Sequence, residues 1–188
     1  MKKIFTILAM LFAVINIMAQ EHLSFKGIPI EGSITTFCQK LKTKGFTSIG
    51  RDNNITMFTG DFTGRKATVG VTATDDGKNV FAVIVFFDPS GEWNTLVNTY
   101  DYYKSLYIRK YGKPTKSNEY KPNPCEGNNA LMYRLNQGII KYSSSWNVLG
   151  GTIEISIEKG KNREGLIVIK YIDTQNTKVK IQKELEDI

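Results

Sequence analysis

Few residues of this chain have side chains suited to catalysis or metal binding. The one histidine, His22, lies near the amino end, where a nucleophile–histidine site would depend on a mobile segment. Zinc sites use clusters of His or Cys, and the sequence contains no such cluster. Asp75-Asp76-Gly77 carries carboxylates but lacks the alternating ligand spacing of a calcium-binding loop. We therefore expect no catalytic residue, no metal site and no cofactor.

The two cysteines, Cys38 and Cys125, fit no redox or metal motif. In an oxidising compartment they could pair as a disulfide. Alternatively, Cys38 acts as a small hydrophobe, because it lies on the apolar side of an expected helix. The sequence supports both interpretations.

Carboxylates offer one route to hydrolytic chemistry. Glycoside hydrolysis requires two of them at a defined separation, and a chain with 18 acidic residues contains many pairs. A small carboxylate-dependent hydrolase acting on envelope glycans or peptides is therefore an alternative hypothesis. The candidate acids are Asp61, Asp88, Glu92, Glu154 and Glu158.

The favoured functional surface is a polar face on two expected strands. In residues 151–159 isoleucines alternate with polar residues, so the polar side chains share the face turned away from the core. Antiparallel pairing with residues 139–146 brings small hydroxyls and opposite charges together, which suits a protein or glycan partner. A plain solvated sheet face is the alternative. The expected cross-strand pairs are Lys141 with Glu158, Ser143 with Ser156, and Ser145 with Glu154.

The helices that support this face follow from apolar spacing. Residues 34–41 form an amphipathic stripe after the extended arm "FKGIPIEG", with Ser33 as N-cap and Gly45 at the end. A longer helix is expected at about 92–111. Residues 130–137 can form a short helix or a strand. A terminal helix at about 177–187 should turn Val179, Leu185 and Ile188 inward.

Six segments have the character of strands. The run 80–87 is apolar on both faces, so we expect a central strand with both sides covered. Residues 75–79 have hairpin composition. The six expected strands are 54–60, 65–74, 79–87, 139–146, 151–159 and 166–173.

The order of elements predicts an α+β fold made of two helix-plus-antiparallel-sheet pseudo-repeats, about 33–88 and 92–173, packed as one domain. Two copies packed together can bury strands that one copy would leave exposed. The matching spacings are Phe58, Phe62, Val69 and Val71 in the first copy, and Tyr142, Trp146, Ile153 and Ile155 in the second.

This repeat order resembles the beta-lactamase-inhibitor-protein fold, which small outer-membrane-assembly lipoprotein domains share. The string "FKGIPIEG…F…L…GF", with "FTGDFTG" and a closing "YID", is similar to uncharacterised exported proteins of Gram-negative bacteria. The first likeness implies protein binding through a sheet face and no catalytic residues. The second implies no particular function.

The first 19 residues have the composition of a signal peptide. Lys2 and Lys3 precede an apolar run that is short for a membrane span, and Ala19 suits a cleavage site. An uncleaved anchor is the alternative. Cleavage would leave one domain, residues 20–188, without a transmembrane span, in the periplasm or secreted. Of the 25 basic residues, 23 would remain against 18 acidic ones.

The remaining basic residues are spread along the chain, so we expect no nucleic-acid partner. The sequence predicts an exported, non-enzymatic binding module for a protein or glycan of the cell envelope. The alternatives are the hydrolase above and a structural or envelope-assembly protein. The third would self-associate through strand 80–87 and the aromatic helix.

Overall fold

The structure is a computed structural model and describes residues 21–52, 54–186 and 188. The expected signal peptide, 1–19, lies outside the described residues. An antiparallel sheet of eight strands, in the order β3-β4-β5-β6-β10-β9-β8-β7, organises the chain and confirms the α+β class. The strands are β3 (Thr47–Asp52), β4 (Ile55–Phe62), β5 (Arg65–Ala73), β6 (Val80–Phe86), β7 (Lys116–Glu119), β8 (Tyr142–Val148), β9 (Gly151–Lys159) and β10 (Gly165–Asp173).

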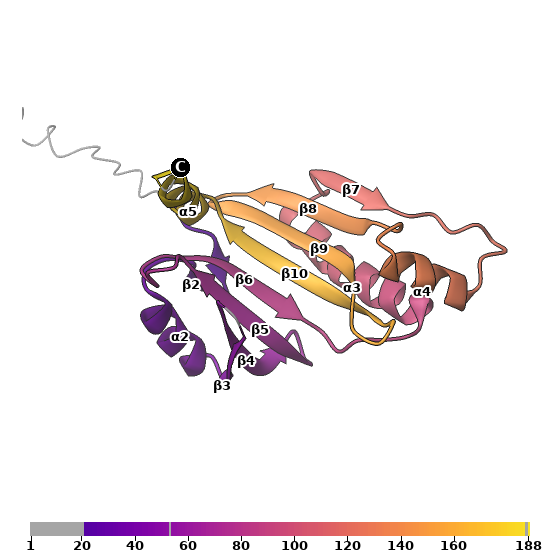
Figure 1. Cartoon of the computed structure of the whole chain (residues 1–188), viewed down its shortest axis with the longest axis horizontal. Helices are drawn as coiled ribbons and strands as arrows, with labels where there is room; N and C mark the ends of the chain where they lie inside the picture. Colours follow the sequence, from indigo (N-terminus) through magenta and orange to yellow (C-terminus); the bar gives the residue numbers. More distant parts are fainter. Residues whose placement is uncertain (1–20, 53, 187) are drawn as a thin grey trace, which may run out of the picture.

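Three helices and a small hairpin cover one face of this sheet, here called the inner face. Helix α3 packs against β8, β9 and β10, and α4 packs beside it (Figure 1). A small hairpin of two short strands and helix α2 cover the other half, near β4 and β5. The helices and the hairpin are α2 (Ile34–Thr43), α3 (Trp93–Tyr111), α4 (Asn128–Asn136), α5 (Thr174–Glu186), β1 (Ser24–Phe25) and β2 (Ile28–Pro29).

Helix α2 begins and ends as its sequence predicts. The Ser33 hydroxyl accepts a hydrogen bond from the backbone N–H of Thr36 at 3.2 Å, which satisfies a free amide of the first turn. After the last turn the chain reverses through Gly45 at φ +87°, a conformation that favours glycine. Residues 128–136 form a helix, which decides between the two alternatives for that segment.

Strand β6 is central, as its apolar sequence predicts, because it pairs with β5 on one side and β10 on the other. Val83 and Val85 point to the inner face and have no exposed surface. Ile84 and Phe86 point to the opposite face and are only half-buried. The expectation that both sides are covered is therefore wrong: one face is packed and the other is partly open.

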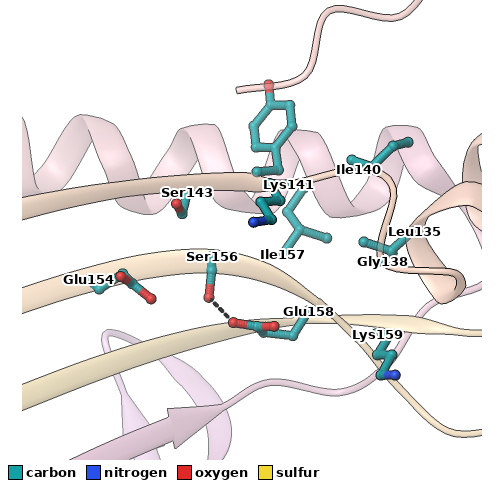
Figure 2. Close-up of a pocket in the computed structure, with 11 residues that line it drawn as sticks. Leu135, Gly138, Ile140, Lys141, Ser143, Glu154, Ser156, Ile157, Glu158 and Lys159 are labelled. Carbon is teal, nitrogen blue, oxygen red and sulfur yellow. Dashed lines mark hydrogen bonds between the residues drawn. The ribbon is translucent and has the colours of Figure 1, made fainter. Parts of the chain in front are cut away.

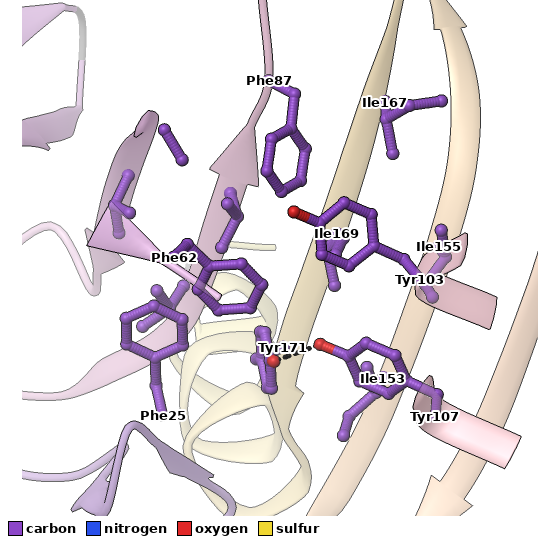
Figure 3. Packing of buried hydrophobic residues seen from close by; sticks show 14 of the residues in the cluster. Phe25, Phe62, Phe87, Tyr103, Tyr107, Ile153, Ile155, Ile167, Ile169 and Tyr171 are labelled. Atoms are coloured by element: carbon purple, nitrogen blue, oxygen red, sulfur yellow. Dashed lines mark hydrogen bonds between the residues drawn. The ribbon is translucent and has the colours of Figure 1, made fainter. Parts of the chain in front are cut away.

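Aromatic side chains fill the centre of the inner face (Figure 3). The rings of Phe25 and Phe62 stack with centroids 5.8 Å apart, and those of Phe87 and Tyr103 with centroids 4.6 Å apart. Each buried ring removes a large apolar area from water, and ring pairs at these separations add to that stabilisation. The hairpin, β4 and α3 are thus joined in one core.

The amino-terminal segment is fixed to the sheet, which corrects the expectation of a mobile end around His22. Asp173 is fully buried and accepts hydrogen bonds from the backbone N–H groups of Leu23 and Asn176, both at 2.9 Å. Nδ1 of His22 lies 3.1 Å from the same carboxylate. Nε2 of His22 lies 3.9 Å from Glu31, so the ring faces carboxylates on both sides.

Helix α5 starts at Thr174, three residues before the expected position 177. The prediction that Val179, Leu185 and Ile188 point inward is wrong, because they are 38%, 57% and 101% exposed. The helix is held instead at its first turn. There Asn176 is buried and its amide donates to the carbonyls of Ile30 and Val80, at 3.0 and 2.7 Å.

Cys38 and Cys125 are both free thiols, so the disulfide considered above is not formed. Cys38 lies in α2, whereas Cys125 precedes α4, and these helices lie at opposite ends of the sheet (Figure 1). Within the described part of the chain, each helix is too short or too polar to cross a bilayer.

The residue pairs matched between the two halves of the sequence do not occupy equivalent ladder positions. Phe58 pairs with Val69 across β4 and β5. The alignment matches Phe58 with Tyr142 and Val69 with Ile153. However, Ile153 pairs with Trp146 across β8 and β9, and Tyr142 lies four residues before Trp146 on β8. A two-residue turn joins the strands in both hairpins. Aligning the two hairpins at their turns therefore matches different residues from those that the sequence spacing matches.

Candidate functional site

The predicted polar residues lie together on the open face of the sheet, opposite α3. The ladder pairs Ser143 with Ser156 and Ser145 with Glu154, as the alternation predicts. Ile155, between the polar residues of β9, has no exposed surface and points to the core. Alternation along β9 therefore fixes which side chains are available to a partner.

A pocket of about 310 Å³ occupies this face where β8 and β9 approach α4. Five of the six predicted residues line it (Figure 2). The sixth, Ser145, lies further along β8. The backbone after α4 closes one end of the pocket. The lining residues are Leu135, Gly138, Ile140, Lys141, Tyr142, Ser143, Glu154, Ser156, Ile157, Glu158 and Lys159.

Lys170 of β10 is the central cation of this face, and the sequence analysis missed it. Its Nζ lies 3.5 Å from Oε1 of Glu154 and 3.2 Å from Oε1 of Glu158. Glu158 therefore forms its ion pair with Lys170, and not with Lys141 as expected from the sequence. Lys141 precedes β8, which begins at Tyr142, and is exposed.

Ser156 links these charges to the sheet. Its hydroxyl donates to Oε1 of Glu158 at 2.8 Å, and the residue is only 2% exposed. Oε1 of Glu158 thus accepts from both Ser156 and Lys170. The arrangement presents fixed hydrogen-bonding groups on a rigid strand pair.

The ion pairs at this site can be exchanged for contacts with a ligand. The side chains of Lys170 and Glu158 are 33% and 42% exposed, so water screens their attraction. Ion pairs at such positions contribute at most about 1 kcal/mol to stability. A partner can thus compete for these groups at small cost to the fold.

An apolar strip continues the site toward the middle of the sheet. Val168 pairs with Ser156 on one side and with Phe86 on the other, so the three share the open face. Ile84 pairs with Lys170 and is half-buried. The open face is therefore charged over β9 and apolar over β6, rather than polar throughout.

Tyr142 also borders the pocket, but its ring packs edge-on against Trp93 and Tyr100 of α3, on the inner face. Burial, together with the charges of Asp101 and Glu119, raises the pKa of its phenol to about 12. The hydroxyl is consequently protonated at neutral pH.

A second polar cluster, around Glu119, lies on the inner face and fastens β7 to α3. Oε1 of Glu119 accepts from the hydroxyls of Tyr100 at 2.8 Å and Ser144 at 3.0 Å, and it pairs with Lys104 at 2.5 Å. Burial acts to raise the pKa of Glu119, but these hydrogen bonds outweigh it and the pKa is lowered. This cluster explains why the short polar strand β7 joins the sheet.

The structure brings together two of the five acids considered for hydrolysis, Glu154 and Glu158, in the open-face pocket. The acid whose pKa is raised is a different one, Asp101. Burial is the main cause, and the charge of Glu119 adds to it. Asp101 lies on α3 and does not line that pocket. Among residues 21–52, 54–186 and 188, no group of three or more His, Cys, Asp or Glu side chains is placed to hold a metal ion.

Comparisons with protein-family models, with curated proteins and with solved structures find no match to this chain.

Proposed function

We propose that this chain is an exported, non-enzymatic binding module that recognises a protein or glycan partner through the open face of its sheet. The observation that carries this proposal is the position of Lys170. It lies between Glu154 and Glu158 on an accessible face, with Ser156 fixed beside them. Such a surface offers donors and acceptors of both charges in one rigid frame.

The apolar strip favours a protein as the partner. Protein interfaces combine an apolar centre with a polar rim, and here half-buried Phe86 and Ile84 adjoin the charged group around Lys170. A glycan is the alternative within the same proposal, because small hydroxyls and carboxylates also suit sugar hydroxyls.

Export and ancestry belong to the same proposal. The amino-terminal composition supports a signal peptide and a periplasmic or secreted location. The mirrored strand order, β4-β5-β6 against β8-β9-β10, supports two pseudo-repeats of the kind that the beta-lactamase-inhibitor-protein fold contains. Likeness to exported proteins of Gram-negative bacteria is consistent with both.

The experiment compares capture by two immobilised variants and the parent protein from envelope extract. Lys170→Met removes the central cation. Lys183→Met removes a comparably exposed lysine, 43% against 33%, that pairs with Asp76 on another side of the molecule. We expect Lys170→Met to lose a partner that the parent and Lys183→Met both retain. Equal capture by all three would contradict the placement of the site.

A carboxylate-dependent hydrolase is the second candidate, because Glu154 and Glu158 approach the same ammonium within one pocket. Its test is the release of soluble fragments from purified envelope glycan or peptide by the parent protein and by Glu158→Gln. Turnover that Glu158→Gln abolishes would favour the hydrolase over the binding module.

The self-association alternative has less surface on α3 than expected. Tyr100 and Tyr103, on the aromatic side of α3, have no exposed surface because they pack in the core. Strand β6 has neighbours on both edges. A monomer in sedimentation at high concentration would agree with this arrangement.

A further inference from the structure

A second hollow lies on the inner face, where its two coverings meet. Helix α3 covers the half of the sheet around β9, and the β1–β2 hairpin covers the half around β5. Between them is a space of about 240 Å³, distinct from the open-face pocket. An apolar cavity of about 150 Å³ holds one benzene molecule, so this space accommodates an aromatic ring with a short substituent.

The walls of this hollow are aromatic and fixed (Figure 3). The rings of Phe62 and Tyr103 have centroids 6.1 Å apart, and Tyr107 and Tyr171 are hydrogen-bonded through their hydroxyls. The Tyr103 hydroxyl lies 3.1 Å from that of Thr63. Because these three phenols already have partners, the walls at their positions offer ring surfaces.

Two lysines stand at the mouth of the hollow. Among the described side chains, neither Lys26 nor Lys110 forms an ion pair with a carboxylate. Nζ of Lys26 donates to the carbonyl of Asp61 at 3.1 Å, which leaves two of its three donors. Nζ of Lys110 lies 4.9 Å from the ring centroid of Tyr111. The mouth is therefore cationic, and the carboxylate of Glu21, which lines the adjoining hollow, forms no ion pair with either lysine among the described side chains.

The two turns that bound the hollow have unusual backbone conformations. Lys26 has φ +49° and Thr63 has φ +55°, in the left-handed region that costs about 1 kcal/mol or more for a residue with a side chain. Both side chains line the hollow. Each of the two residues is followed by a glycine at φ +77°, the pattern of a two-residue hairpin turn, so these conformations follow from the two hairpins.

A shallower hollow of about 480 Å³ adjoins the first, and both are lined by Lys26, Lys110, Tyr111 and Tyr171. Both lysines therefore border the two hollows where these meet. A ligand can place its ring between the aromatic walls and its charged group at the junction.

We propose that this hollow binds a small aromatic carboxylate, with the ring between Phe62 and Tyr107 and the carboxylate at Lys26 and Lys110. Charge complementarity selects an anion, the ring walls select a flat apolar body, and the volume limits it to one substituted ring or a fused pair. This site is independent of the open-face function, because the two lie on opposite faces of the sheet.

The test uses phenylacetate and indole-3-acetate as probes in calorimetric titrations of the parent protein. The neutral analogue 2-phenylethanol and plain acetate serve as ligand controls. We expect saturable binding of at least one aryl acetate, with a dissociation constant below about 1 mM. Acetate should not bind, and the alcohol should bind about tenfold more weakly because it lacks the charge-assisted hydrogen bond.

Two protein variants test whether binding depends on the charge of Lys110 in particular. Lys110→Met should weaken aryl acetate binding about tenfold and leave the alcohol unchanged. Lys113→Met removes an exposed lysine just past the end of the same helix and should change neither. Failure of both aryl acetates to bind the folded parent protein would overturn the proposal, as would equal affinity for acid and alcohol. An equal loss in the two variants would also overturn it.

Discussion

The ammonium of Lys170 lies 3.2 Å from the carboxylate of Glu158, across the boundary between β10 and β9. Leu166, and not Lys170, is the ladder neighbour of Glu158, so the side chains reach diagonally along the sheet to meet. Lys170 faces Glu154 directly and contacts it as well. One lysine thus organises both carboxylates of the open face.

The first prediction concerns the close approach of backbone at Gly151. A Cβ there would lie 2.2 Å from the carbonyl oxygen of Ile172, which backbone hydrogen bonding holds in place. Gly151→Ala should lower the free energy of unfolding by about 2 kcal/mol or more, measured by urea denaturation. Gly91→Ala, where a Cβ meets nothing within 4 Å, should change it by less than about 0.5 kcal/mol. Similar values for the two would contradict the strand pairing at this position.

The second prediction concerns Asp173, which ties the amino-terminal segment to α5. Asp173→Asn removes the charge of the carboxylate to which two backbone N–H groups donate. We expect it to lower the free energy of unfolding, measured by thermal denaturation, by about 2–4 kcal/mol. Hydrogen exchange should also become faster at Leu23. The exposed Asp75→Asn is the control and should leave both measurements unchanged. An unaltered exchange rate at Leu23 would show that the segment is held by other contacts.

The third prediction is a pH dependence that originates at Glu119. Its pKa in the folded protein is lowered from the ordinary value of 4.5, so ionised Glu119 stabilises the fold. This contribution is complete above about pH 4.5 and is lost as the pH falls through the lowered pKa. The stability difference between the parent and Glu119→Gln, from urea denaturation at several pH values, should therefore shrink on acidification. A difference that grows toward low pH would contradict the assignment.

The fourth prediction concerns the reactivity of the two thiols. Burial raises the pKa of Cys38, although the charge of Lys42 acts against it, so thiolate is scarce at neutral pH. Cys125 is exposed. Iodoacetamide followed by peptide mass spectrometry should therefore modify Cys125 several-fold faster than Cys38. Resistance of both cysteines until a reductant is added would instead indicate a disulfide.

Alternation along the sequence was sufficient to predict the core strands and the local register. Residues 151–159 form β9 with the expected bounds, and Ser143 pairs with Ser156 because hairpin pairing depends on neighbouring residues only. The N-cap at Ser33 is likewise a local feature. Such features depend on residues that are close in the sequence.

The missed features depend on distant residues or on weak local signals. Lys170 could not be assigned to the site without knowing that β10 lies between β9 and β6. The edge strand β3 is exposed throughout, so it has no alternation to detect. Strand β7 is polar and joins the sheet through Glu119, whose partners Tyr100 and Ser144 lie far away in the sequence.

The exposed face of α5 shows a different limit of prediction from apolar spacing. Its apolar residues, including Leu185, have the spacing of a buried stripe, but the helix packs through Asn176 at its first turn. Apolar spacing therefore predicted the helix itself but not how it is anchored.

The central claim is that the open face, with Lys170 at its middle, binds the partner. The most direct measurement is a calorimetric titration of the captured partner into the parent protein, Lys170→Met and Lys183→Met. The account predicts that Lys170→Met weakens binding at least about tenfold, because an interfacial charge-assisted contact is lost. Lys183→Met should match the parent. Unchanged affinity in folded Lys170→Met would contradict the claim.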